Sequence, residues 1–491
     1  MNGNTISHPS LWEGLGGLPQ EFVEYTSSLF GEEKWKNYLA SFDGSVPVSV
    51  RLNPFKMPKE EFFSETEKTP VPWCRNAFYL AQRPNFTLDP LLHAGVYYVQ
   101  EAGSMFLDEV LRQLKIENGK LKIESPQLKT DNEKLKCEGE EFSIFNSQFS
   151  IGSALDLCAA PGGKSTLLRA ALPDDVVLYS NEPDRRRANI LMENIQKQGH
   201  PNVIVTNNYA IDYQRAGMTF DLIVCDVPCS GEGMFRKDHD AIGEWSLQNV
   251  MKCAALQRSI IEDIWPCLND GGVMVYSTCT FNLHEDEENV KWICETLGAE
   301  IIPIEIKDEW NITGSLLKGW DKPVYRFIPG TTKGEGLFMA VLRKLPLTRP
   351  ADTLSPRGEG EVSNGSSKKR SLRKKVISPS PFGERVSAGR VRGCLKVLSD
   401  GHPVGTQKGK NIIPAHAEAL LINLPKDKYP FAELSKEDAL KYLHHEAIVL
   451  DADVPKGFVI VTYQGHPLGF VKNIGNRANN LYPQEWKIRN L

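Results

Sequence analysis

The sequence lacks a long hydrophobic run. None of its apolar stretches approaches the ~18 consecutive residues that a membrane-spanning helix requires. Its opening, MNGNTISHPSLWEGLGG, contains neither a basic region nor an apolar core, so no secretory signal peptide is predicted. Hydrophobic residues make up 41% and charged residues 24% of the chain, which excludes disordered and fibrous classes. We therefore expect a soluble, cytoplasmic protein with no membrane partner.

Cysteine pairs at zinc-ribbon spacing are also absent. Ten cysteines lie scattered between Cys74 and Cys394 without a CxxC motif. Disulfide frameworks are typical of short secreted chains, so we expect reduced thiols, each either a small core residue or a reactive group. No metal site is predicted, and nothing in the sequence indicates that His93 is a metal ligand.

An overall excess of positive charge is missing too, because the net charge is −5. A surface for nucleic acid must therefore be a local patch. The segment 346–393 is rich in Ser, Pro and Gly, and between Lys368 and Arg392 it carries nine basic residues against one acid, Glu384. It is either a solvated flexible linker or a tether to phosphates. The polar, Lys/Glu-rich segment 113–150 is predicted to be a surface insertion.

The middle third of the chain alternates short apolar runs with helix-like segments, which is typical of a parallel α/β sheet. One helical pattern begins at Arg185 and is closed by Gly199. A strand, a glycine turn, a helix and then an acidic residue at the next strand end form the layout of a nucleotide-type binding crevice. We predict strands over 154–157, 176–182, 202–206, 220–227 and 271–278.

The last hundred residues have the pattern of a separate small α+β domain. The segment KGFVIVTYQGHPLGFVKNI predicts a β-hairpin around Gln464–Gly465. Its charged and aromatic residues could hold RNA by charge and stacking, although a core role explains the aromatics equally well. The candidates are Lys456, Lys472, Arg477 and Tyr482.

The glycine turn CAAPGGKST follows the first predicted strand. A phosphate-binding loop needs a glycine where this chain has Cys158, so an NTPase is not favoured. Gly162 and Gly163 let the backbone pass close to a ligand, and Glu182 can accept hydrogen bonds from ribose hydroxyls. S-adenosylmethionine has that ribose and lacks phosphates, so it suits this turn.

Two cysteines follow the ends of two predicted strands. Cys229 lies in DVPCSGEGMFRKD and Cys279 in TCTFNLHEDEENV. Open α/β sheets bind their ligands at the carboxyl ends of strands, so we expect both thiols in one crevice. Four other cysteines are predicted core residues: Cys225, Cys253, Cys267 and Cys294.

A thiol beside a methyl donor suits methylation at carbon 5 of a pyrimidine. That carbon is a poor nucleophile until a group adds to carbon 6, and a thiolate is suited to this addition. Asp226 can assist at the base N3 and exocyclic amine, and a base must remove the proton from carbon 5. Packing is the alternative role for a lone strand-end cysteine, whereas two thiols beside an acid and a glycine turn favour catalysis.

The segments LDLCAAPGGKST, DVPCSGEGMFRKD and YSTCTFNLHEDEENV resemble the RNA 5-methylcytosine methyltransferases of the NOL1/NOP2/Sun family, in particular its bacterial rRNA branch of the RsmF type. The resemblance implies an α/β fold: a Rossmann-like S-adenosylmethionine-dependent methyltransferase domain between an N-terminal RNA-binding α+β domain and a C-terminal PUA-like domain. The implied boundaries are 1–92 for the N-terminal domain, 93–345 for the methyltransferase domain, 346–393 for the basic linker and 394–491 for the PUA-like domain.

The resemblance also implies roles for individual residues. Cys279 would attack carbon 6 of the cytosine and Cys229 would assist release of the product. DNA cytosine methyltransferases instead attack with the Pro-Cys cysteine, which would exchange these two roles. Lys164 would order the cofactor turn and Asp226. The implied S-adenosylmethionine contacts are Cys158, Ala159, Ala160, Pro161, Gly162, Gly163, Lys164, Glu182, Asn208 and Asp226.

On this basis we expect a monomer that methylates 16S rRNA or the 30S subunit. The target base must be flipped or already unpaired to be reached. Arg236 and Lys237 follow the thiol loop, either as contacts to flanking phosphates or as a solvated helix start. The alternatives are a tRNA cytosine-C5 methyltransferase and a non-catalytic RNA-binding ribosome-assembly factor.

Overall fold

The computed structural model describes residues 17–58, 62–114, 152–346, 395–408 and 411–489, together with four two-residue strands. Nearly all of the predicted basic linker 346–393 and most of the predicted insertion 113–150 lie outside these ranges. Short described parts of the insertion form a three-stranded sheet of β5 (Ile116–Glu117), β6 (Lys120–Leu121) and β7 (Phe149–Ser150), in that order. Within the described ranges, the helices are too short or too polar for a membrane span.

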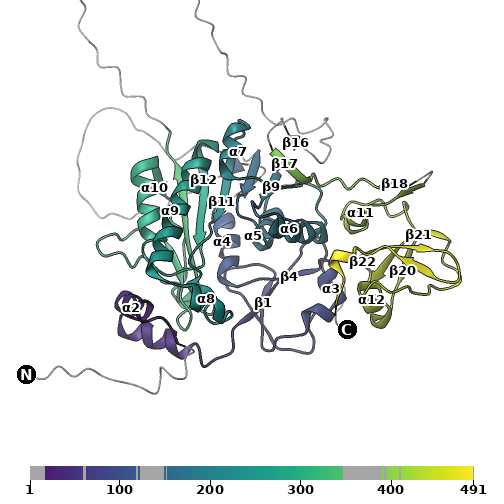
Figure 1. Cartoon of the computed structure of the whole chain (residues 1–491), viewed down its shortest axis with the longest axis horizontal. Coiled ribbons are helices and arrows are strands. Elements are labelled where there is room, and N and C mark those ends of the chain that lie inside the picture. Colours follow the sequence, from purple (N-terminus) through teal and green to yellow (C-terminus); the bar gives the residue numbers. More distant parts are fainter. Residues whose placement is uncertain are drawn as a thin grey trace, which may run out of the picture.

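A ten-stranded sheet forms the centre of the molecule (Figure 1), in the order β13-β15-β12-β11-β8-β9-β10-β17-β16, with β14 paired to β15. The run β12-β11-β8-β9-β10 is parallel and corresponds to the five predicted strands. The bounds are β8 (Ser153–Asp156), β9 (Val177–Asn181), β10 (Val203–Thr206), β11 (Phe220–Asp226), β12 (Leu268–Thr278), β13 (Ala299–Ile301), β14 (Tyr325–Phe327), β15 (Leu337–Lys344), β16 (Arg390–Val391) and β17 (Leu395–Ser399).

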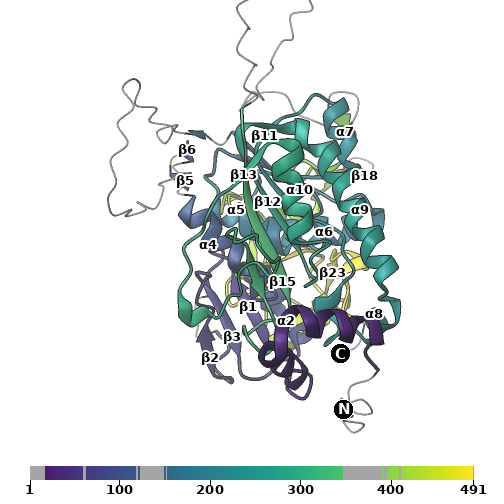
Figure 2. The same ribbon diagram turned by 90° about the vertical axis from the view of Figure 1, so that its left-hand side faces the viewer.

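Helices cover both faces of this sheet (Figures 1 and 2), because alternate residues of each buried strand point to opposite sides. In β11, Leu222 and Val224 pack towards α4, α5 and α6, whereas Ile223 and Cys225 pack towards α7, α9 and α10. The predicted α/β fold is therefore confirmed. The helices are α4 (Phe106–Gln113), α5 (Gly163–Ala171), α6 (Arg185–Gln198), α7 (Ala210–Arg215), α8 (His239–Glu244), α9 (Leu247–Ile264) and α10 (Glu287–Leu297).

The N-terminal region contains an antiparallel sheet and a separate helix, α2. Its antiparallel sheet has the order β2-β3-β1-β4 and includes β4, which lies beyond the predicted boundary at residue 92. The first described helix, α2, bends at Gly31 and packs beside the domain that contains the central sheet, where Phe22 contacts Phe235 and Trp245. The bounds are α2 (Gln20–Ala40), β1 (Val48–Leu52), β2 (Lys68–Pro70), β3 (Ala77–Leu80), α3 (Pro90–His93) and β4 (Tyr97–Val99).

The C-terminal region is the predicted small α+β unit, and the hairpin around Gln464–Gly465 is confirmed as β21 and β22. The strand expected at the start of this domain, β17, lies in a different sheet. Because β17 pairs antiparallel with β10, the predicted start of the terminal domain belongs to the central sheet instead. The remaining elements are β18 (Thr406–Lys408), β19 (Asn411–Ile413), α11 (His416–Leu420), β20 (Phe431–Glu433), α12 (Lys436–Leu443), β21 (Gly457–Tyr463), β22 (His466–Asn473) and β23 (Ala478–Asn480).

Short 3₁₀ turns complete the connections. The loop after β11 contains Cys229 and, three residues later, the 3₁₀ turn η3 (Glu232–Met234). The others are η1 (Phe86–Leu88), η2 (Gly103–Met105), η4 (Trp265–Cys267), η5 (Asp308–Trp310) and η6 (Gln484–Trp486).

Candidate active site

The predicted site residues gather at the carboxyl ends of β8, β9, β11 and β12. The strand order places β8 beside β11, where the chain reverses its direction of winding across the sheet. Open α/β sheets bind ligands at such a switch point, because the loops from the two neighbouring strands leave in opposite directions.

The glycine turn joins β8 to α5 at this point. Gly162 precedes α5 with φ +119°, a conformation that favours glycine, and the Ala160–Pro161 peptide bond is cis. Helix α6 holds the turn from outside: Asn194 donates to the Pro161 carbonyl at 2.8 Å and Arg187 donates to the Ala160 carbonyl at 3.0 Å. The backbone of the predicted cofactor turn is thus fixed by side chains of α6.

Glu182 lies immediately after β9 and is only 2% exposed. Its Oε1 accepts from the Asp184 N–H at 3.0 Å, while its Oε2 has no hydrogen-bond partner among the described residues. The Arg187 guanidinium lies 3.6 Å from Oε2. Burial raises the pKa of this carboxyl group. A buried acceptor oxygen with no donor fits a ribose hydroxyl, as S-adenosylmethionine would supply.

Lys164, which is buried, pairs with the partly exposed Asp226 between the turn and β11. The Lys164 Nζ lies 2.8 Å from Asp226 Oδ2, and the Ser277 hydroxyl donates to Asp226 Oδ1 at 2.7 Å. Burial alone would lower the pKa of Lys164, but the Asp226 carboxylate raises it overall. The charged Lys164 thus forms an ion pair that holds Asp226 in place.

The two thiols meet above the ends of β11 and β12. Cys229 Sγ lies 3.0 Å from Cys279 Sγ, and the Cys279 N–H donates to Cys229 Sγ at 3.3 Å. The hydrogen bond to Cys279, and then burial, raise the pKa of Cys229 well above its usual range. Cys229 therefore keeps its proton beside Cys279. Cys158 also stays a thiol, since burial raises its pKa.

Sequence reasoning missed three buried acids of this site. Asp156 ends β8, accepts from the Ser165 hydroxyl at 2.6 Å, and has its pKa raised to about 7 by burial. Glu232 and Glu285 lie buried in the two thiol loops. The position of Asp156 directly before the glycine turn could have revealed it, whereas acids in polar loops are ordinarily exposed.

The Asn208 side chain, predicted to contact the cofactor, is hydrogen-bonded to the backbone of Lys396. Its side chain accepts from the Lys396 N–H at 2.8 Å and donates to the Lys396 carbonyl at 3.1 Å. Lys396 Nζ also donates to Asn207 Oδ1 at 2.9 Å. These bonds engage both polar atoms of the Asn208 side chain in docking β17 onto the end of β10. The amide nitrogen keeps one further donor and the oxygen one further acceptor position, so the cofactor contact of Asn208 stays a prediction.

Other candidates have partners within the protein. Lys237 pairs with Glu335, and Arg236 donates to backbone carbonyls, the nearer being Ser45 O at 3.3 Å. Tyr482 is 2% exposed in the core of the C-terminal unit, so it is not available for stacking on RNA. His93 is buried and bonds the Thr87 carbonyl. Across the described residues, no group of His, Cys, Asp and Glu could hold a metal ion.

Three family descriptions match successive parts of the chain. The family described as 16S rRNA methyltransferase RsmB/F matches residues 148–343. The N-terminal domain of 16S rRNA methyltransferase RsmF matches residues 18–102, and the methyltransferase RsmF PUA domain matches residues 430–488.

Full-length relatives are similar along nearly the whole chain. The Ribosomal RNA small subunit methyltransferase F of Aliivibrio fischeri is 30% identical, and the alignment covers 95% of this chain and 97% of the relative. The protein of the same description from Photobacterium profundum is 28% identical over the same shares. A crystallised methyltransferase homologue from Pyrococcus horikoshii shares the fold, with a TM-score of 0.53, 24% identity, and coverage of 69% of this chain and 100% of that one.

Proposed function

Because this chain belongs to the RsmB/F family of 16S rRNA methyltransferases, in its RsmF branch, we propose that it methylates carbon 5 of a cytosine in small-subunit ribosomal RNA. The methyl donor is S-adenosylmethionine. A tRNA substrate is less well supported, because the similar relatives are named for the ribosomal small subunit. That the enzyme is monomeric and cytoplasmic stays a prediction.

The crevice has the groups that this cofactor needs. Glu182 Oε2, which accepts no hydrogen bond from the described residues, would hold the ribose, and the turn 158–164 would lie against the cofactor at Gly162. Lys164 holds Asp226, which leaves that carboxylate at the junction between the cofactor turn and the thiols. When bound, S-adenosylmethionine supplies an electrophilic methyl group on a sulfonium.

The two thiols have different roles in the covalent steps. We assign the attack to Cys279, as the family resemblance implies, with Cys229 Sγ 3.0 Å from Cys279 Sγ. Its attack forms a bond to carbon 6 and makes carbon 5 nucleophilic. After methylation, a base takes the carbon 5 proton, the freed electron pair re-forms the double bond between carbons 5 and 6, and the bond from carbon 6 to Cys279 Sγ breaks. Cys229 supports this release. The observation that carries the proposal is the 3.0 Å approach of the two thiols in a crevice that also holds Asp226.

A covalent-trapping experiment tests these roles. Wild type, Cys229→Ala, Cys279→Ala and the double variant are incubated with S-adenosylmethionine and unmethylated small-subunit rRNA and resolved on a denaturing gel. We expect Cys229→Ala to accumulate a nuclease-sensitive protein–RNA adduct, because release fails while attack proceeds. Cys279→Ala and the double variant should form none.

The other outcomes discriminate between the alternatives. An adduct with Cys279→Ala would mean that Cys229 attacks, as in DNA cytosine methyltransferases. A wild type that transfers no methyl group, with no adduct in any variant, would indicate a non-catalytic RNA-binding protein. Sequencing the trapped RNA identifies the cytosine.

A further inference from the structure

Two buried carboxylate side chains link the two loops that carry the thiols. We call residues 227–238 the Cys229 loop and residues 279–286 the Cys279 loop. Glu232 belongs to the Cys229 loop and Glu285 to the Cys279 loop, and both are at most 1% exposed. Glu232 makes most of its hydrogen bonds to the opposite loop, and Glu285 accepts from the Ser230 N–H of the opposite loop.

Glu232 holds the backbone that follows Cys279. Its Oε2 accepts from the Phe281 N–H at 2.6 Å and from the Asn282 N–H at 3.1 Å, and the Thr280 hydroxyl donates to the same oxygen. The neighbouring Gly233 N–H donates to the Cys279 carbonyl at 2.8 Å. The position of Cys279 is therefore set largely from the Cys229 loop.

Glu285 holds the backbone around Cys229 in the same way. Its Oε2 accepts from the Ser230 N–H at 3.0 Å and from the Gln257 amide at 2.7 Å. The Gln257 amide also donates to the Pro228 carbonyl at 2.9 Å. Glu285 and Gln257 thus fix the peptide groups on both sides of Cys229.

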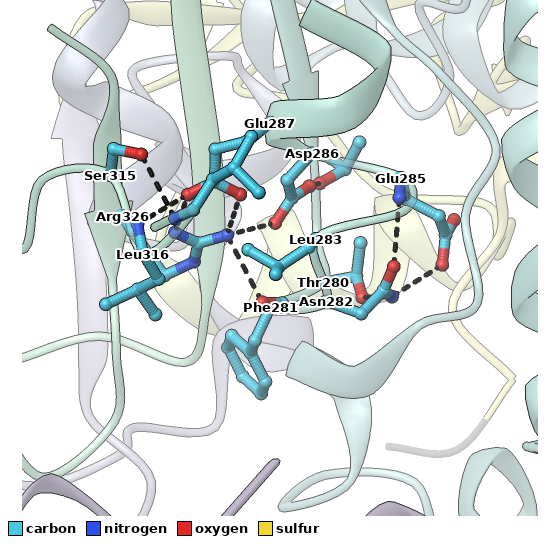
Figure 3. A network of polar contacts seen from close by, with 12 residues as sticks. Thr280, Phe281, Asn282, Leu283, Glu285, Asp286, Glu287, Ser315, Leu316 and Arg326 are labelled. Atoms are coloured by element: carbon cyan, nitrogen blue, oxygen red, sulfur yellow. Dashed lines mark hydrogen bonds and ion pairs between the residues drawn. The ribbon is translucent and has the colours of Figure 1, made fainter. Parts of the chain in front are cut away.

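Asn282 joins the two acids. Its amide nitrogen donates to Glu232 Oε1 at 3.0 Å and to Glu285 Oε1 at 2.9 Å, and its oxygen accepts from the Glu285 N–H at 2.9 Å. Figure 3 shows the Asn282 side chain turned towards Glu285 within the Cys279 loop. A shift of either carboxylate therefore moves a group shared by both loops.

Stability alone does not account for this arrangement. The hydrogen-bond donors to both carboxylates are neutral groups, and burial together with the charge of Glu232 raises the pKa of Glu285 to about 7. Buried acids held only by neutral donors stabilise a fold less than apolar side chains of similar volume would. What the carboxylates do provide is a fixed direction for several N–H groups next to each thiol.

We propose that Glu232 and Glu285 are positioning residues that act on different steps: Glu232 places Cys279 for attack, and Glu285 places Cys229 for release. This inference rests on the proposed function, in which the two thiols carry those two steps. It predicts that each acid controls the thiol of the loop opposite its own.

Adduct kinetics separate the two roles. Full-length Glu285→Gln, Glu232→Gln and Cys229→Ala are mixed with S-adenosylmethionine and unmethylated small-subunit rRNA, and adduct formation and decay are followed by rapid quenching. We expect Glu285→Gln to form the adduct normally but release it about 10- to 100-fold more slowly, so that it accumulates. Glu232→Gln should form the adduct more slowly by a similar factor, without accumulation.

Two further variants keep the test sharp. Thr280→Val removes one donor to Glu232 while keeping both acids, and should slow adduct formation in the same direction even if Glu232→Gln does not fold. Glu288→Gln, which changes a partly exposed acid paired with His284 in the same segment, should behave as wild type.

The outcomes distinguish this inference from the proposed function. If Cys229→Ala traps no adduct, the proposed function itself is wrong. If Cys229→Ala traps the adduct but the two acid variants slow both steps equally, or leave both unchanged, the two acids have no separate positioning roles.

Discussion

At the scale of single residues, Glu182 combines burial with an unused acceptor. Folding removes its carboxylate from water, yet Oε2 gains no hydrogen bond from the described residues. A buried acceptor without a donor costs free energy that a ligand hydroxyl can offset. The energetic gain from binding the ribose is therefore expected to concentrate at this atom.

We expect Glu182→Gln to weaken binding of S-adenosylmethionine about tenfold, since a hydrogen bond to a charged group is replaced by one to a neutral amide. Isothermal titration calorimetry on the full chain measures this dissociation constant. Glu193→Gln, the same change on the neighbouring helix α6, is the matched control and should bind as wild type. Unchanged affinity in Glu182→Gln would show that the ribose lies elsewhere.

At the scale of elements, a buried ion cluster fixes the start of α10 beside the Cys279 loop. Arg326 on β14 lies 2.9 Å from Asp286 and 2.6 Å from Glu287, and all three side chains are fully buried. Arg326 also donates to the Phe281 carbonyl at 3.2 Å, and the cluster is drawn in Figure 3. A short strand that sequence reasoning missed thus supports the loop that carries Cys279.

We expect Arg326→Met to lower the free energy of unfolding by about 3–5 kcal/mol, because it leaves two buried carboxylates without their cation. Arg343 lies on β15, the strand next to β14, and forms a partly exposed ion pair with Glu300. Arg343→Met removes this pair and should lower the free energy of unfolding by at most about 1 kcal/mol. Urea unfolding followed by circular dichroism gives both values. Equal losses in the two variants would contradict this account.

At the scale of the whole molecule, the N-terminal sheet is attached directly to the helices of the cofactor turn. Arg51 donates to Thr166 on α5 at 2.7 Å, and Asn53 donates to the Gln198 carbonyl on α6 at 3.1 Å. Lys56 donates to the Lys197 carbonyl at 2.7 Å. The same sheet shares a hydrophobic core with the C-terminal unit. The N-terminal sheet thus packs against both the helices beside the site and the C-terminal unit.

Lys56 makes this attachment dependent on pH. Burial lowers its pKa from 10.5 to about 7, so between these values the unfolded chain binds a proton that the folded chain has released. Stability should therefore rise with pH across this window, by at most about 1.4 kcal/mol per pH unit from this group.

The measurement is the free energy of unfolding of wild type and Lys56→Met from pH 7 to 10. We expect the wild-type curve to rise relative to that of Lys56→Met across this range. Lys426→Met, at an exposed lysine of the C-terminal unit, should run parallel to wild type. Parallel curves for Lys56→Met would mean that Lys56 keeps its ordinary pKa.

Much of the methyltransferase domain could be predicted because its signals are local. The five parallel strands follow from short apolar runs, and the end of α6 follows from Gly199, which adopts φ +85°. Strand β15 was missed although LFMAVLRK is apolar, because nothing local indicates that it returns antiparallel to β12. The boundary at residue 92 separated β4 from its sheet because pairing between distant segments leaves no trace in a hydrophobic pattern.

By itself, the sequence determined the chemistry of this protein: two thiols, an acid and a glycine turn, each at the end of a predicted strand. Residue types and their spacing along the chain can be read directly from the sequence, so these groups can be identified without the structure. Only the tertiary structure decided how the groups are used. It brought Cys229 to 3.0 Å from Cys279, engaged Asn208 with Lys396, and buried Glu232 and Glu285 across the two thiol loops. The reason is physical: hydrogen bonds and burial depend on distances between atoms that lie far apart along the chain, and residue type alone does not encode those distances.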